Sequence, residues 1–204
     1  MLFALASCGA TLSNPVGWSA GAVADGTLYV GTIEGDIRAV SLDVDAAGAI
    51  RTLWSCHLRG EDESTAIYGT PQIAEGSLYV AGYDGRLYTL SVAPNELSCD
   101  ERLVLDYRVG QSAAPIVGGP TVVEDLVLVG SSDGKLYALN AEDGFEVWSF
   151  QTQNKIWSTP VVSNGVAYVG SLDQHLYAVD IEDGSERWRF PAKGAIATTP
   201  LVAH

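Results

Sequence analysis

Residues 120–150 read PTVVEDLVLVGSSDGKLYALNAEDGFEVWSF, and residues 160–190 read PVVSNGVAYVGSLDQHLYAVDIEDGSERWRF. Without any gap, 15 of these 31 positions are identical, so this part of the chain repeats itself. A repeat of about 40 residues is one supersecondary unit that cannot bury its hydrophobic surface alone, and it must stack on its neighbours. The repeat therefore decides the architecture before any single residue is considered.

The repeat unit is predicted to consist of β-strands. Residues 127–129 and 136–139 are rich in β-branched, aromatic and aliphatic side chains. The Asp-Gly pair at 133–134 lies between them and is typical of a tight hairpin turn. A second Asp-Gly turn at 143–144 precedes the alternating run at 146–150. With the run that opens the unit, this gives four short strands, which accounts for the repeat length.

The same frame extends towards the N-terminus. A hydrophobic strand that ends in Gly or Ala recurs at residues 28–31, 78–81, 127–130 and 167–170. An acidic turn follows each of them, and the last turn has Gln174 where the others have Gly. Gln174 is therefore expected either to adopt the left-handed conformation, at a cost of about 1–2 kcal/mol, or to belong to another turn type.

Four antiparallel strands repeated radially describe a β-propeller. We predict an all-β propeller of four-stranded antiparallel blades, with four blades, the start of a fifth and an incomplete ring. An open ring leaves an unpaired edge, so the chain is expected to be a fragment or a truncated product. The expected segments are a leader at 1–13 and a propeller at 14–204, with blades at 16–58, 66–110, 116–151, 156–191 and, incomplete, 195–204.

The units resemble the pyrroloquinoline-quinone-like (PQQ-like) propeller repeat. The sequence DGKLYALN at 133–140, the Asp-Gly pair at 143–144 and the aromatic residues Trp148 and Phe150 carry this resemblance, and residues 176–190 repeat it. The resemblance covers roughly residues 18–204 and is looser in the first two units. It implies a chain built of stacked propeller blades.

In that family, the repeated Trp docks one blade on the next. The resemblance therefore implies a structural docking role for Trp148 and Trp188, and for Trp54 in the first unit. Tyr107 stands near the same position in the second unit. Trp18 and Trp157 head the innermost strands and are the only aromatic residues considered for a place near the axis, and a packing role is the favoured interpretation of both.

The PQQ-like family includes quinoprotein dehydrogenases and also non-catalytic propellers, such as the periplasmic lipoprotein of the outer-membrane protein assembly machinery. The dehydrogenases commonly carry adjacent cysteines beside the cofactor, and the three cysteines of this chain are never adjacent. Its three histidines share no metal-ligand spacing, and no nucleophile elbow or phosphate-binding loop is present. We therefore expect no enzyme activity, no catalytic residues, no cofactor and no metal.

The chain is acidic, with a formal net charge of −14. This charge argues against nucleic acid as a partner and against a polybasic membrane contact. The acidic run at 61–63 is interpreted as a solvated loop. The expected partners are other proteins.

The N-terminus resembles an export signal. Residues 5–8 read LASC, which is similar to a bacterial lipobox, and Cys8 would then be the lipidated residue. The stretch lacks a positively charged start and is short for a full signal peptide, which a missed upstream start would explain. The resemblance implies an exported, lipid-anchored protein in the periplasm or at the cell surface, and the alternative is an ordinary N-terminal strand.

Cys56 and Cys99 lie in the first and second units. In an exported protein they can bridge adjacent blades, and the alternative is two free buried thiols. For the whole chain, we expect a non-catalytic exported scaffold for protein–protein interaction, in envelope or outer-membrane protein assembly. A fragment of a PQQ-dependent dehydrogenase and an extracytoplasmic sensor or ligand-binding domain remain alternatives.

Overall fold

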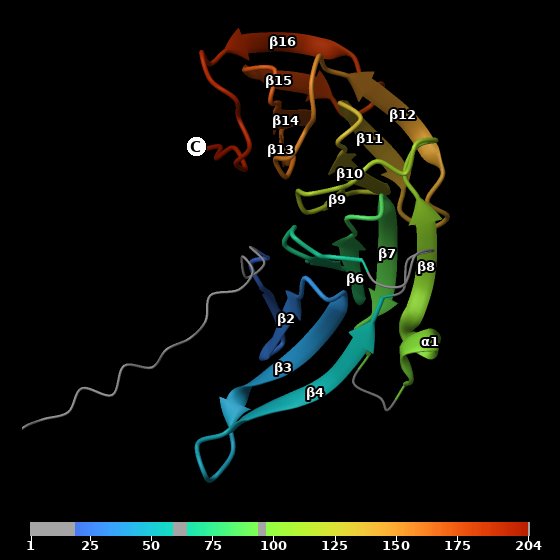
Figure 1. Ribbon diagram of the computed structural model, residues 1–204, viewed down its shortest axis with the longest axis vertical. Helices are drawn as coiled ribbons and strands as arrows, with labels where there is room; N and C mark the ends of the chain where they lie inside the picture. The colour runs from blue at the N-terminus through green and yellow to red at the C-terminus, as the bar shows by residue number, and fades with distance from the viewer. Residues whose placement is uncertain (1–18, 59–64, 94–96, 204) are drawn as a thin grey trace, which may run out of the picture.

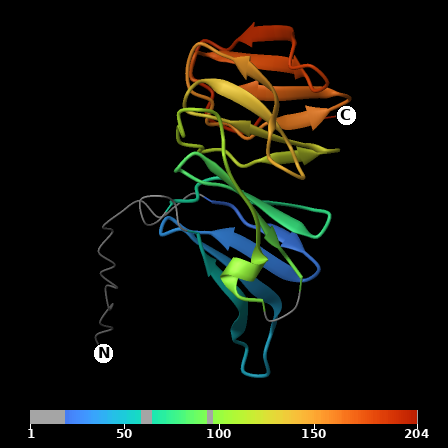
Figure 2. The ribbon, with the colours of Figure 1, turned by 90° about the vertical axis from the view of Figure 1, so that its right-hand side faces the viewer.

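The structure, a computed structural model, describes residues 19–58, 65–93 and 97–203. They form four sheets, each of four antiparallel strands in sequential order. In Figure 1 the sheets follow one another along an arc from β2–β4 to β13–β16, and the arc does not close. Figure 2 shows the same succession from the side, as a stack of sheets. The predicted all-β, incomplete propeller is confirmed.

Each sheet has two short inner strands and two longer outer ones. The first sheet contains β1 (Ala22–Ala24), β2 (Thr27–Gly31), β3 (Asp36–Val44) and β4 (Ile50–His57). The second contains β5 (Gln72–Ala74), β6 (Ser77–Ala81), β7 (Arg86–Ser91) and β8 (Leu103–Arg108), and a single helical turn, α1 (Cys99–Arg102), precedes β8.

The third and fourth sheets are the two most similar repeats. The third contains β9 (Thr121–Val123), β10 (Leu126–Gly130), β11 (Lys135–Asn140) and β12 (Glu146–Gln151). The fourth contains β13 (Val161–Ser163), β14 (Val166–Gly170), β15 (His175–Asp180) and β16 (Glu186–Pro191). Residues 192–203 contain no strand. Of the expected fifth blade, the structure therefore describes only the connection that would lead into it.

The turn with Gln174 keeps the geometry of its repeats. Gln174 has φ 73° and donates its N–H to the Ser171 carbonyl at 3.2 Å. Gly134 has φ 88° and makes the equivalent bond to the Ser131 carbonyl at 3.1 Å. The left-handed alternative is therefore the correct one, and the turn type is unchanged.

The hydrophobic core is divided into three clusters, one at each interface between successive sheets. Successive side chains of a strand point to opposite faces, so a strand in the middle of its sheet contributes to two clusters at once. In β7, for example, Tyr88 and Leu90 face the first sheet, whereas Leu87 faces the third. This is why these strands are apolar runs without a polar alternation.

The inner ends of the sheets meet through close backbone contacts. A Cβ atom at Gly69 would lie 2.4 Å from the Gly118 carbonyl oxygen, and one at Gly118 would lie 2.7 Å from the Ser158 carbonyl oxygen. Side chains add hydrogen bonds between sheets, since Thr159 Oγ1 accepts from Gly119 N at 2.8 Å and Gln72 Oε1 accepts from Val122 N at 2.8 Å. The sheets are therefore fixed to one another along the inner side of the arc.

Candidate functional site

The third and fourth sheets are joined by Trp148 on β12. Its side chain is 8% exposed, and its Nε1 donates to the Ile181 carbonyl at 2.8 Å. The indole ring lies directly over Gly184, where a Cβ atom would come within 2.7 Å of the ring. Trp148 thus fills the outer part of this interface and satisfies its own polar atom there.

Trp54 occupies the corresponding place between the first and second sheets. It packs against the cluster that contains Tyr29, and the two ring centroids are 5.8 Å apart. From the second sheet, the Arg102 guanidinium lies 4.6 Å from the Trp54 ring centroid and donates to the carbonyls of Ser91 and Ala93. A buried cation over an indole face is a favourable contact, so Arg102 links the two sheets.

Trp188 on β16 is equivalent to Trp148 but is 45% exposed. It contacts Tyr168 of its own sheet, with 5.8 Å between ring centroids. Its role in docking a further blade stays a prediction.

The strand register corrects the sequence alignment of the second repeat. In the first, third and fourth sheets, an alanine of the third strand pairs with a tryptophan of the fourth strand, namely Trp54, Trp148 or Trp188. In the second sheet the equivalent pair is Thr89 with Leu105. Tyr107 pairs with Leu87 and so occupies the place of Phe150, two residues beyond the Trp position. The second sheet therefore has no indole at its boundary with the third.

A cleft of about 630 Å³ opens where that indole is missing. Its apolar lining comes from both sheets and includes Tyr79 and Leu105 of the second and Val122 and Ala141 of the third. Tyr107 packs beside it against Gly144, with its ring 6.0 Å from that of Phe145. Tyr107 thus closes part of the interface that Trp148 closes in the next repeat.

The cleft contains a buried hydroxyl group. Thr89 on β7 lines it, is 3% exposed, and its Oγ1 has no hydrogen-bond partner among the residues that the structure describes. The equivalent residues in the other sheets are Ala39, Ala138 and Ala178, each paired with its Trp. An unpaired buried hydroxyl is costly, so its presence at this one interface calls for a partner.

The rim of the cleft is acidic. Glu75 contributes from the second sheet, and Glu124, Asp125 and Glu142 contribute from the third. The residues that line the cleft include no Lys or Arg. Burial and the Glu75 charge raise the pKa of the Tyr79 hydroxyl, which therefore stays neutral. The site is thus a cleft with an apolar patch on each wall, one buried hydroxyl and a negative entrance.

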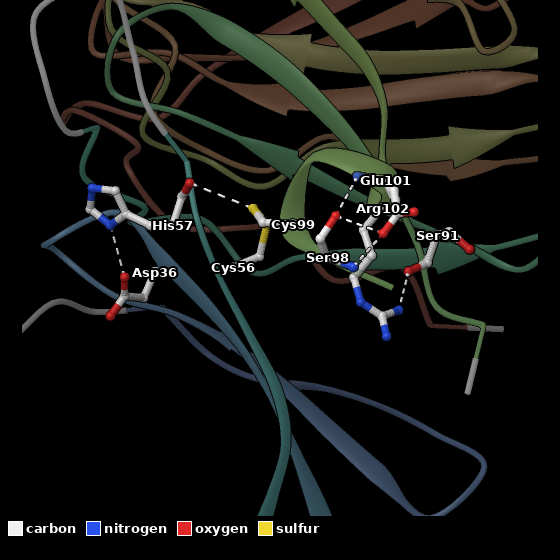
Figure 3. Close-up of a disulfide and its surroundings, with 8 residues drawn as sticks. All are labelled: Asp36, Cys56, His57, Ser91, Ser98, Cys99, Glu101 and Arg102. Atoms are coloured by element: carbon white, nitrogen blue, oxygen red, sulfur yellow. Dashed lines mark hydrogen bonds and ion pairs between the residues drawn. A yellow bond between two sulfur atoms is a disulfide. The ribbon is translucent and has the colours of Figure 1, made fainter. Parts of the chain in front are cut away.

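Cys56 and Cys99 form a disulfide between the first and second sheets, with their Cα atoms 5.0 Å apart (Figure 3). Cys56 takes the place that Phe150 takes in the third sheet, because it pairs with Ile37. Beside it, His57 Nδ1 lies 2.8 Å from Asp36 Oδ1. Hydrogen bonds from Arg38 and then His57 lower the pKa of Asp36.

The Asp of each hairpin turn serves the turn itself. In the last three sheets, its carboxylate accepts from the hydroxyl of the Tyr four residues later, at 2.5–2.8 Å. The pairs are Asp84 with Tyr88, Asp133 with Tyr137 and Asp173 with Tyr177. Burial, and then this bond, raise the pKa of Tyr177 to about 12.

Residues 106–203 match the profile of a family described as outer membrane protein assembly factor BamB. The same relation appears in structure, since BamB from Moraxella catarrhalis superposes with a TM-score of 0.71 at 23% identity. Residues 106–203 are therefore similar to the PQQ-like repeats of the BamB family, and the described chain shares the BamB fold. The match covers 91% of this chain and 54% of that structure, so the chain spans about half the length of the BamB propeller.

Further solved structures share the fold. The computationally designed Ika8 protein superposes with a TM-score of 0.69 at 16% identity, covering 90% of this chain and 52% of that one. A europium-containing methanol dehydrogenase superposes with a TM-score of 0.67 at 15% identity, covering 83% and 40%. No curated protein sequence matches the chain. At these identities the structural matches establish the fold.

Trp157 heads the fourth sheet and lies close to the connection before it. Trp157 donates its Nε1 to Ser132 Oγ at 3.0 Å, and Lys155 Nζ lies 5.7 Å from its ring. Across residues 19–58, 65–93 and 97–203, no three His, Cys, Asp or Glu side chains are grouped to hold a metal ion.

Several predicted features lie outside the described residues. They are Cys8 and the leader, Trp18 and the acidic run at 61–63. Within the described part, no helix is long and apolar enough to cross a bilayer. The sequence did not indicate the cleft, although Leu105 in place of Trp is its signal once the register is known.

Proposed function

We propose that the chain is part of a non-catalytic β-propeller scaffold that assists the assembly of outer-membrane proteins by binding other proteins. The observation that carries this proposal is the match of residues 106–203 to the BamB family, together with a BamB structure that covers 91% of the chain. The proposed setting is the bacterial envelope, with Cys8 as the lipid anchor.

The construction of the arc supports a scaffold role. The Cys56–Cys99 disulfide joins the first sheet to the second, and a hydrogen bond from Val122 N to Gln72 Oε1 joins the second to the third. The buried Trp148 and the Gly119–Thr159 hydrogen bond join the third to the fourth. Such fixed sheets present their connecting loops and interface clefts in a constant arrangement, which suits a binding surface. The disulfide is also consistent with an oxidising compartment such as the periplasm.

A dehydrogenase fragment is the weaker alternative. The methanol dehydrogenase match extends over 40% of that enzyme and reflects the propeller fold. Fold alone does not carry an activity, and the described residues offer no metal-ligand cluster to support quinone chemistry.

The proposal is tested by deleting the gene for the full protein in its own host. We expect less folded outer-membrane β-barrel protein, measured by heat-modifiable migration in gels. The native gene is expected to restore the level, and a Cys8→Ser version is expected to restore it only in part. Unchanged levels of folded barrels after deletion would overturn the assembly role.

A further inference from the structure

We infer that the cleft between the second and third sheets binds an aromatic side chain of a partner, presented by a short basic peptide segment. This inference deepens the proposed function, on which it rests for the view that the partner is a protein. It names the chemistry of the segment recognised and the residues that recognise it.

The aromatic part follows from the repeat. The strand register shows that Leu105 in the second sheet is equivalent to Trp148 in the third. In the same way, Ala141 of the third sheet is equivalent to Ile181 of the fourth. The Trp148 indole is held by stacking on Gly184 and by donation to the Ile181 carbonyl. In the cleft, Tyr107 already covers Gly144, the counterpart of Gly184, so a guest ring has the remaining space beside Leu105, Thr89 and Ala141.

The buried hydroxyl supports a guest with a polar atom. Thr89 Oγ1 lines the cleft without a partner, where the repeats with an indole have Ala. A hydroxyl can accept from an indole N–H or pair with a phenol, so Trp and Tyr suit the site better than Phe.

The basic part follows from the rim. Glu75, Glu124, Asp125 and Glu142 surround the entrance, and no lining residue is cationic. The acidic rim therefore favours a peptide in which Lys or Arg flanks the guest aromatic residue. The same charge, with a net −14 over the whole chain, disfavours a second copy of this protein as the occupant.

The test uses the full chain and the peptide acetyl-Lys-Trp-Lys-amide, with binding followed by calorimetry and by amide chemical shifts of the chain. We expect saturable binding that weakens as salt rises, with shifts centred on Leu105, Thr89 and Ala141. Acetyl-Lys-Ala-Lys-amide and acetyl-Glu-Trp-Glu-amide are each expected to bind at least tenfold more weakly. Indole alone binding as tightly as the peptide would contradict a peptide site.

Two variants place the peptide in the cleft. Leu105→Trp fills the cleft with the chain's own indole and is expected to weaken binding at least tenfold. Its matched control is Val147→Trp, because Val147 is exposed and precedes the Trp position of the third sheet. Glu142→Lys on the exposed rim provides a second test, with an expected loss of at least threefold, should Leu105→Trp disturb folding.

Each outcome decides the inference. Binding that Leu105→Trp and Glu142→Lys leave unchanged, shifts located elsewhere, or no binding at millimolar peptide would overturn it. Failure of the deletion experiment with peptide binding intact would instead remove the assembly role and leave the cleft as a peptide site.

Discussion

The Trp148 indole donates its Nε1–H to the Ile181 carbonyl at 2.8 Å, across the boundary between the third and fourth sheets. One side chain thus supplies both hydrophobic burial and a hydrogen bond to the neighbouring repeat. Its equivalent in the fourth sheet, Trp188, is 45% exposed in this chain. Two residues at the same repeat position therefore differ in their contribution to stability.

Trp148→Ala is expected to lower the free energy of unfolding by about 3–5 kcal/mol, because it leaves a cavity at a sheet boundary. Trp188→Ala is the matched control and is expected to cost about 1 kcal/mol or less in this chain, since little burial is lost. Urea unfolding monitored by far-ultraviolet circular dichroism measures both. Equal losses for the two variants would contradict a docking role confined to Trp148.

Gly184→Ala tests the contact from the other side. Gly184 has φ 74°, and a Cβ atom there would lie 2.7 Å from the Trp148 ring. Gly165→Ala is the matched control, because Gly165 has φ 73° and no atom within 4 Å of its Cβ position. Its expected cost is only that of the left-handed backbone, about 1–2 kcal/mol. We expect Gly184→Ala to cost about 1–3 kcal/mol more, from the displaced indole. Thermal melts of the two variants that coincide would rule out this contact.

The fold was predictable because the repeat is nearly regular where the sequence is most similar. The Asp-Gly turns and the apolar strands follow from local backbone chemistry that each unit repeats. For Gln174 the sequence leaves two alternatives, and the structure selects the left-handed conformation. Stacking of the units then follows, because a four-stranded unit with two apolar faces needs a neighbour on each side.

The site was less predictable because it depends on one missing side chain. The second repeat has a longer connection between β7 and β8 than the third repeat has between β11 and β12, and it includes α1. This connection changes the sequence spacing to β8, so the sequence alone suggests Tyr107 for the Trp position. Hydrogen-bond register, which sequence does not contain, assigns that position to Leu105. The cleft and the unpaired Thr89 hydroxyl become visible only with this assignment.

The Cys56–Cys99 disulfide is expected to stabilise the first two sheets. It closes a loop with a sequence separation of 43, for which loop-closure entropy predicts about 4 kcal/mol. Reduction with dithiothreitol should lower the urea midpoint of the native chain by a corresponding amount. The double variant Cys56→Ser with Cys99→Ser serves as the control and should not respond to the reductant. A native chain that is equally insensitive would contradict the stabilising role.

Asp173 should give the fourth sheet a pH-dependent contribution. Its side chain is 4% exposed, and its carboxylate accepts from Gln153 N at 2.9 Å, from the Tyr177 hydroxyl at 2.8 Å and from His175 N at 3.0 Å. Burial raises the pKa of Asp173, but these hydrogen bonds, led by that from Gln153, outweigh burial and hold it below its ordinary value of 3.8.

A lowered folded-state pKa means that the contribution is fully present above pH 3.8 and is lost as the pH falls through the folded value. Asp173→Asn keeps the shape but turns an amide donor towards these donors, so we expect a loss of about 2 kcal/mol at pH 7. Urea unfolding at pH 7 and pH 2.5 should show the difference from the native chain shrinking at the lower pH. Asp100→Asn on the exposed face of α1 is the control, with little expected change. A difference that stays constant between the two pH values would mean that the charge of Asp173 does not stabilise this turn.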